Sequence, residues 1–277
     1  MRRCSWPLGL ALLLASVDAA AAQPIATHQE ARRWAQALSV ASPYKIGTAA
    51  LAGQIRYRIA FDGIDGDLPE TGEQRVGGTD DTGHELIVCA DCGREAAPTP
   101  QALAGYTRAN AWIESEDPRL RRFATRNDRG DNIDRRMTRL ADAVRRHLDA
   151  GIDFRHYDSA ATAWEKRSGD CTEAALLLAA LARARGIPTR VASGLAYSSR
   201  FTGRSHLFSP HVWVQAWDGE RWRSYDAGLS GFDAGHIAVH VGDGTPADFP
   251  RIIALLRGMR IVDAAGVRAR TPAPVED

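Results

Sequence analysis

Three residues of types that act together in acyl transfer lie in the second half of the chain. Cys171 lies in the run from Arg167 to Glu173, and His211 and Asp226 follow on two segments that are expected to form one β-hairpin. A thiol can attack a carbonyl carbon, an imidazole can take and return a proton, and a carboxylate can orient the imidazole. The pattern therefore predicts a cysteine nucleophile, its base and the group that orients the base.

Cys171 is expected at the first position of a helix. The residues after Asp170 are dense in good helix formers up to Arg185, after which a glycine and a proline end the pattern. Asp170 stands where an N-cap belongs, and Glu173 can complete a capping box. The positive helix end favours a thiolate, although the carboxylate of Asp170 opposes it, so we expect a lowered pKa for the thiol. A structural cysteine on a core helix is the alternative.

The segment that begins at His211 alternates between inward and outward positions, as a strand does. Asp218 and Gly219 form a strong hairpin-turn signal, and residues 220–226 supply the return strand. A two-residue turn sets His211 opposite Asp226, with Cβ atoms about 4.5–5.5 Å apart. A bulge would shift the pairing by one residue and move Asp226 to the other face. A surface histidine and an unrelated strand-end aspartate form the alternative.

Four blocks of sequence around these residues occur in the order of one known family. They are Gly169-Asp-Cys171, Leu-Ala-Arg-Ala-Arg-Gly-Ile-Pro-Thr-Arg190, His211-Val-Trp213 and Trp222-Arg-Ser-Tyr-Asp226. Over roughly residues 130–245 the chain resembles the transglutaminase-like superfamily, and most of all its exported bacterial members. The resemblance implies an α+β, papain-like fold in which the cysteine helix packs on an antiparallel sheet. It also implies that Cys171 is the nucleophile, His211 the general base and Asp226 the orienting group.

The same family has an oxyanion-stabilising side chain upstream of the cysteine, and this sequence has no clear match for it. Trp164 is the nearest candidate, with core packing of its own helix as the alternative. The backbone N–H of Cys171 is a second donor that could stabilise an oxyanion.

The N-terminus carries the pattern of an export signal. Arg2 and Arg3 precede a short apolar run, and an A-x-A-like cleavage site ends at Ala22, so residues 1–22 are predicted to be a signal peptide. We expect a bacterial periplasmic or secreted protein. Neither the signal nor any later segment has the length of about 20 apolar residues that spans a bilayer, so no membrane span is expected after signal removal. A retained signal anchor is the alternative.

The rest of the chain is expected to contain two main parts. Residues 23–115 are predicted to form a mixed, β-leaning N-terminal region, residues 116–263 the transglutaminase-like core, and residues 264–277 a C-terminal tail. Periodicity and turn signals predict a loop over residues 62–81, a strand over 85–89, a helix over 133–148, a strand over 189–197, a polar loop over 198–210, a helix over 248–256 and an edge strand over 259–262.

A second pair of cysteines lies upstream of the core. Cys89 and Cys92 have the spacing of a zinc knuckle, but a structural zinc needs four ligands and the sequence has no second pair. Export to an oxidising compartment favours a local disulfide, which would leave Cys171 unpaired. Zinc and free thiols are the alternatives.

Two later histidines could also bind a metal. His236 and His240 are expected on one face of a strand, with Asp233 and Asp243 nearby. The alternation of a half-exposed strand explains these residues equally well, so no metal ligand and no cofactor is assigned.

Composition narrows the classes of partner. The chain has 277 residues, 44% of them hydrophobic, and a formal net charge of +1, which offers no electrostatic attraction for nucleic acid or an anionic membrane. The expected function is thiol-dependent acyl transfer or hydrolysis at peptide or carboxamide bonds, as in a cysteine peptidase, an amidase or a transglutaminase. The expected substrate is a peptide or protein amide, such as one derived from the cell wall. A catalytically idle binding module and a metal hydrolase that uses the later histidines are the alternatives.

Overall fold

The structure, a computed structural model, describes residues 28–64, 66–150, 157–229 and 231–266. The predicted signal peptide over residues 1–22 lies outside the described residues, as does most of the predicted C-terminal tail. Within the described residues, no helix is long and apolar enough to cross a bilayer.

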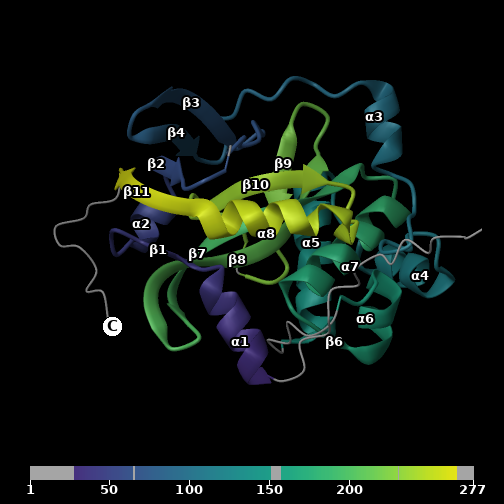
Figure 1. Cartoon of the computed structure of the whole chain (residues 1–277). Helices are drawn as coiled ribbons and strands as arrows, with labels where there is room; N and C mark the ends of the chain where they lie inside the picture. Colours follow the sequence, from purple (N-terminus) through teal and green to yellow (C-terminus); the bar gives the residue numbers. More distant parts are fainter. Residues whose placement is uncertain (1–27, 65, 151–156, 230, 267–277) are drawn as a thin grey trace, which may run out of the picture.

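A five-stranded antiparallel sheet forms the centre of the molecule (Figure 1). In spatial order its strands are β1 (Val40–Ala41), β8 (Arg204–Trp217), β7 (Thr189–Phe201) and β10 (His236–Gly242), and β9 (Trp222–Tyr225) also pairs with β8. The two longest strands, β7 and β8, pair along nearly their whole length. This sheet carries His211 within β8 and Asp226 just after β9.

The helix that begins at the cysteine packs against this sheet and is surrounded by other helices (Figure 1). This helix is α7 (Cys171–Ala184), and its neighbours are α4 (Pro118–Asn127), α5 (Ile133–His147) and α6 (Ala160–Lys166). Every residue from 173 to 183 is buried, because α7 is apolar on almost all sides and is covered on almost all sides. A helix held this firmly fixes the position of its first residue, Cys171.

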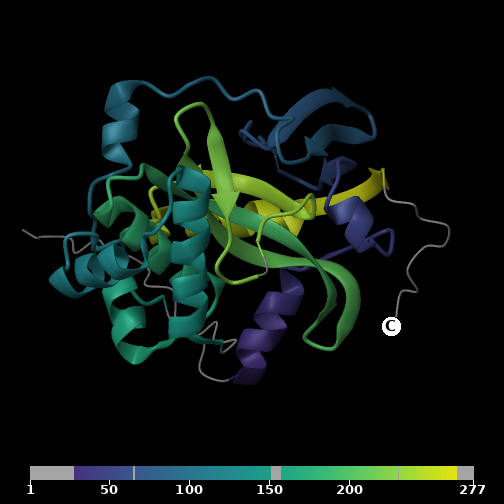
Figure 2. The same ribbon diagram turned by 180° about the vertical axis from the view of Figure 1, so that it is seen from behind.

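A second sheet lies on the other side of the central sheet, and a second hydrophobic core contains residues of both sheets (Figures 1 and 2). Its strands are, in order, β11 (Met259–Ala265), β2 (Ile55–Phe61), β4 (Gly83–Val88) and β3 (Gln74–Asp80). The remaining elements are α1 (His28–Ala37), α2 (Thr48–Leu51), α3 (Pro100–Gly105), the parallel pair β5 (Asp149–Ala150) and β6 (Ser168–Gly169), a 3-10 turn (Pro246–Asp248) and α8 (Phe249–Gly258). Because β11 pairs with β2, the last strand completes the sheet of the N-terminal region. The division at residue 115 stays a prediction.

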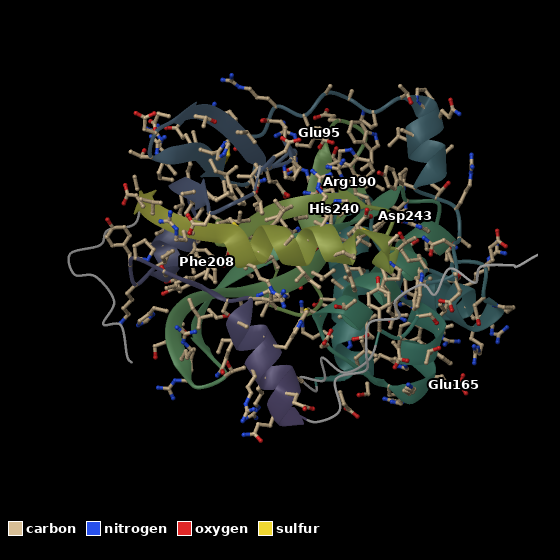
Figure 3. All side chains as sticks on the ribbon, in the orientation of Figure 1. Glu95, Glu165, Arg190, Phe208, His240 and Asp243 are labelled. Atoms are coloured by element: carbon tan, nitrogen blue, oxygen red, sulfur yellow. A yellow bond between two sulfur atoms is a disulfide. The ribbon has the colours of Figure 1, made fainter. Side chains whose placement is uncertain are left out.

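A buried arginine ties the long segment after β4 to the central sheet (Figure 3). The guanidinium of Arg190, on β7, binds both carboxylate oxygens of Glu95 and also donates to Gln215. Its Cζ lies 4.4 Å from the ring centroid of Trp222. A bidentate pair of this kind fixes orientation as well as position, so the segment that joins the two regions is anchored beside β9.

The predicted α+β class is confirmed, as are the helices expected over residues 171–185, 133–148 and 248–256. The loop expected over residues 198–210 is wrong, because β7 and β8 continue through it and turn at Thr202 and Gly203, both with positive φ (50° and 90°). Its polar sequence reflects exposure of the hairpin end to water. The loop expected over residues 62–81 is also wrong in its second half, where β3 pairs with β4.

Candidate active site

The local sequence around Cys171 folds into the expected helix start. The carboxylate of Asp170 accepts from the N–H of Thr172 at 2.8 Å, and that of Glu173 accepts from the N–H of Asp170 at 2.9 Å, so the capping box is confirmed. Glycine at position 169 leaves room for the side chain of Glu173 in this capping box, because a Cβ atom there would lie 2.4 Å from the Cβ of Glu173. Cys171 is the first residue of the helix, so its N–H has no intrahelical acceptor.

The charge state expected for the thiol is wrong. Burial raises the pKa of the Cys171 thiol well above its ordinary value, and the carboxyl of Asp170 raises it further, while a hydrogen bond from the backbone of Val212 acts in the opposite direction. Asp226 and Glu173 add to the repulsion. The field of one helix end does not offset burial together with three carboxyl groups. Cys171 therefore keeps its proton at neutral pH.

His211 and Asp226 meet, but not through the predicted register. Nε2 of His211 lies 2.7 Å from Oδ2 of Asp226, and both residues are buried, with 6% and 2% of their surface exposed. The turn contains four residues rather than two, because the N–H of Asp218 donates to the carbonyl of Arg221 and Trp217 pairs with Trp222. The predicted two-residue turn, and with it the direct pairing of His211 with Asp226, is therefore wrong.

The error of register does not separate the pair, because the ladder shifts by two residues. Continued beyond Tyr225, it would set Asp226 opposite Trp213, diagonal to His211 rather than facing it. A shift of two keeps both side chains on the same face, whereas a shift of one would not. Diagonal neighbours are within reach of long side chains.

Asp226 has a full set of hydrogen-bond donors although its side chain is completely buried. Its Oδ2 faces Nε2 of both His211 and His236, at 2.7 and 3.1 Å, and its Oδ1 accepts from the N–H groups of Gly228 and Leu229, at 2.7 and 3.0 Å. Burial opposes ionisation, but the two imidazoles hold the pKa of this carboxyl well below its ordinary value. Asp226 is therefore a carboxylate at any pH near neutral.

Arg145 fixes the loop that carries these donors. From α5, its Nη2 donates to the carbonyl oxygens of Asp226 and Leu229, at 3.1 and 3.0 Å, and its Nη1 binds Asp142 at 2.7 Å. The helical side of the molecule thus holds the loop after β9 in place.

Cys171, His211 and the loop after β9 line one cleft of about 340 Å³. Its other polar lining comes from Arg145, from Asp170 and from the long hairpin, through Ser198, Arg200 and Ser209. The three candidate residues converge on one point, since a Cβ atom built on Gly228 would lie 3.4 Å from Cβ of Cys171, Cε1 of His211 and Oδ1 of Asp226 alike. The arrangement therefore offers a thiol and an imidazole to a molecule in this cleft, with the buried carboxylate of Asp226 behind the imidazole.

Trp164 lies elsewhere. Its indole stacks on the ring of His147, with centroids 5.3 Å apart, and packs edge-on against Phe123. Arg119 covers it at 5.5 Å. It is not among the residues that line the cleft, which favours core packing over a role at an oxyanion.

The two upstream cysteines are joined. Cys89 and Cys92 form a disulfide with Cα atoms 5.6 Å apart. Among the described residues, Cys171 is the free cysteine.

The two later histidines do not form a shared site. The ladder between β10 and β7 has a bulge between Ala238 and His240, so His236 and His240 point to opposite faces and the expected shared face is wrong. His240, labelled in Figure 3, lies 3.1 Å from Asp248 instead.

His236 approaches the catalytic candidates instead. Ligand atoms of His211, Asp226 and His236 lie within 4.8 Å of one another, a spacing that a metal ion could bridge. However, carboxyl groups bind both nitrogens of His236, through Asp226 at 3.1 Å and Asp233 at 3.0 Å, and raise its pKa to about 9 although burial opposes the charge. A metal needs a neutral imidazole, so this donor set suits a proton better than an ion.

Sequence reasoning missed this second histidine on Asp226. The proximity of Asp233 to His236 in the run Asp-Ala-Gly-His was visible, but it also fits an ordinary turn before a strand. The contact with Asp226 depends on the order of strands in the sheet, which places the start of β10 beside β7 and near the end of β9.

Comparison with known proteins agrees with this fold. Residues 120–227 match the model of the transglutaminase-like superfamily, so the resemblance noted in the sequence is confirmed and the matched core contains all three candidate residues. A search of curated proteins finds no match.

Two solved structures are similar at low identity. A proposed cysteine protease from Cytophaga hutchinsonii has 15% identity and a TM-score of 0.48, with 78% of this chain and 83% of that chain covered. The periplasmic domain of TgpA from Pseudomonas aeruginosa has 19% identity and a TM-score of 0.42, with 67% and 75% covered.

Proposed function

We propose that this protein is a thiol-dependent hydrolase of peptide or other carboxamide bonds. The observation that carries the proposal is that Cys171 and His211 meet in one cleft while the buried Asp226 holds Nε2 of His211. A proton on Nε2 leaves the lone pair on Nδ1, which has no hydrogen-bond partner among the described residues. The imidazole is thus in the tautomer that a general base requires.

The reaction runs through a thioester. Nδ1 of His211 takes the thiol proton as the sulfur of Cys171 attacks the carbonyl carbon, and it then returns the proton to the departing amine. The N–H of Cys171 donates to the oxyanion. A water molecule, deprotonated by His211, attacks the thioester and releases the acid and the thiol. An amine in place of this water would give a transfer product instead.

Because the thiol of Cys171 keeps its proton at neutral pH, the reaction does not begin from a thiolate. Proton transfer then accompanies attack rather than preceding it. This differs from a preformed thiolate, and it makes the reaction depend strongly on the orientation of His211.

The disulfide and the predicted signal peptide support a site of action outside the cytoplasm. The Cys89–Cys92 bridge favours an oxidising compartment, as does the predicted signal peptide over residues 1–22. We therefore propose that the substrates are peptides or cell-wall-derived amides outside the cytoplasm. Mass measurement of the mature protein should give an N-terminus at Gln23.

The experiment compares the parent protein with Cys171→Ser, which keeps the shape of the side chain and weakens the nucleophile. Both are incubated with a library of peptides and carboxamides, with and without a fluorescent primary amine, and products are identified by mass. We expect cleavage by the parent alone, with little amine incorporated. Dominant amine incorporation would indicate acyl transfer. Equal products from both proteins would refute a thiol mechanism, and an absence of products together with an absence of Cys171 alkylation would indicate a binding module.

A further inference from the structure

His236 lies at the centre of a line of alternating imidazole and carboxyl groups that continues from the catalytic pair. In order, the line is His211, Asp226, His236 and Asp233, joined at 2.7, 3.1 and 3.0 Å. His236 is 2% exposed, so both contacts lie away from water. The mechanism proposed above uses the first two groups and leaves His236 without a role.

We infer that His236 is a positioning residue whose buried positive charge, on the far side of Asp226, sets the pH range in which His211 can take the proton of Cys171. The inference rests on the proposed function. It concerns how the charge on one imidazole affects the protonation of the other, since both contact the same carboxylate oxygen.

The geometry supports this role in two ways. Oδ2 of Asp226 faces both Nε2 atoms, so each imidazole competes for the same lone pairs. Asp233 holds the opposite nitrogen of His236 through Oδ1 at 3.0 Å and its backbone oxygen at 3.2 Å, so the ring is fixed from both sides. Trp213 and Phe232 pack against the ring, with centroids 5.2 Å away.

The charged groups around His236 favour its protonated form. Asp226 and Asp233 favour the imidazolium, and the buried carboxyl of Glu73, whose own pKa is raised by burial to about 7, also lies within range of its charge. His211, with its ring centroid 5.6 Å away, is the other titratable ring that faces it. His236 therefore carries a charge throughout the neutral range, because its pKa is about 9.

A fixed cation at this position has a definite effect on His211. It neutralises part of the charge of Asp226, so the carboxylate orients His211 without strongly favouring a second proton on it. His211 then remains a free base at a lower pH than a carboxylate alone would allow. This suits a thiol that keeps its own proton, because His211 must be unprotonated to accept that proton.

The test uses His236→Gln, whose amide nitrogen can still donate to Asp226 but carries no charge. The control is His240→Gln, the same substitution on the same strand next to another carboxylate, Asp248. Titration of the His211 ring by NMR, with labelled histidine, should show its midpoint about one pH unit higher in His236→Gln and unchanged in His240→Gln. The acid limb of Cys171 alkylation should move by the same amount.

An unchanged His211 midpoint in folded His236→Gln would overturn the inference, as would a His236 ring that titrates near pH 6.5 in the parent. If His236→Gln does not fold, Asp233→Asn keeps the ring and removes one of the two carboxyl groups that raise its pKa, so the midpoint of His236 should fall. An unchanged His236 midpoint in this variant would also overturn the inference. The two proposals fail separately. If the His211 midpoint shifts but the rate of Cys171 alkylation does not follow the titration of His211, the proposed function is refuted. The coupling between His236 and His211 would still stand.

Discussion

Two aspartates beside the same thiol, one at the start of α7 and one after β9, have opposite tendencies to ionise. Burial raises the pKa of Asp170 well above its ordinary value, and the charge and hydrogen bond of Glu173 raise it further. Asp226 is the more buried of the two residues, yet its pKa is lowered. The difference lies in the partners, because Asp226 faces two imidazoles and two N–H groups whereas Asp170 has the N–H of Thr172 and a second carboxyl.

The comparison teaches which carboxylate is available to orient a base. Burial alone would neutralise both side chains. Asp226 stays charged because the imidazoles of β8 and β10 face its Oδ2 and its own loop supplies two N–H groups to Oδ1, and Arg145 holds that loop. Asp170 serves the helix instead, where a neutral or charged oxygen can accept from an N–H equally.

The largest expected difference concerns turnover. Asp226→Asn should lower kcat/KM by roughly 10³–10⁴-fold, because an amide can hold the wrong tautomer of His211. Asp170→Asn should change it by roughly tenfold or less, since asparagine is an equally good N-cap. Initial rates on any amide cleaved by the parent give the comparison. Near-parental activity in Asp226→Asn would leave a dyad of Cys171 and His211 as the mechanism.

Replacing each aspartate by alanine should lower the free energy of unfolding far more at Asp226 than at Asp170. Asp226→Ala leaves a buried imidazolium with one of its two carboxylates and should lower the free energy of unfolding by about 3–5 kcal/mol. Asp170→Ala removes a helix cap and should cost about 1 kcal/mol. Urea unfolding at pH 7 measures both. Equal losses at the two positions would mean that the charge on Asp226 has no special share in holding the fold.

The dependence of stability on pH should reveal the cation that keeps Asp226 charged. The pKa of His236 is raised from 6.5 to about 9, so its contribution is complete below pH 6.5 and is lost as the pH rises through 9. This loss is on the order of 3 kcal/mol, and it should be absent in His236→Gln. The contribution of Asp226 to stability depends on pH in the opposite direction. It is present above the pH range in which carboxyl groups ordinarily titrate and is lost in acid. Urea unfolding at pH 6.5 and 9.5 tests the first statement, with His240→Gln as the control.

The sequence predicts the helix side of the site better than the sheet side. Asp170, Cys171 and Glu173 are close in the chain, so their capping box follows from local rules and is found as expected. For the hairpin, the sequence predicts that His211 and Asp226 share a face, but it does not predict the register of the two strands. The reason is that the turn has four residues, closed by the side chain of Asp218, which accepts from the N–H groups of Glu220 and Arg221 at 2.8 Å. A dipeptide signal does not distinguish that turn from a shorter one.

The contacts of the two later histidines could not be predicted. His236 reaches Asp226 because β10 lies beside β7, and the bulge at Ala238 sends His240 to the other face. The thiol pKa was mistaken for a related reason. The helix end is a local feature, but the burial of Cys171 and its exposure to the charge of Asp226 depend on how the helix meets the sheet.

The smallest effect tests the other half of the comparison, the influence of Asp170 on the thiol. Because the carboxyl of Asp170 raises the pKa of Cys171, Asp170→Asn should let the thiol ionise at a lower pH while the helix keeps its cap. Alkylation of Cys171 near pH 9 should become roughly three- to tenfold faster.

The pH profile of that rate carries the sharper information. In acid, Asp170 holds its own proton and differs little in charge from asparagine, so the rates of the two proteins should converge as the pH falls. Asp131→Asn, which removes an exposed carboxylate paired with Arg135, is the control for a general change of charge and should match the parent throughout. Identical profiles for Asp170→Asn and the parent would mean that Asp170 acts on Cys171 through the helix cap alone. The raised pKa of the thiol would then have to come from burial and from the carboxyl groups of Asp226 and Glu173.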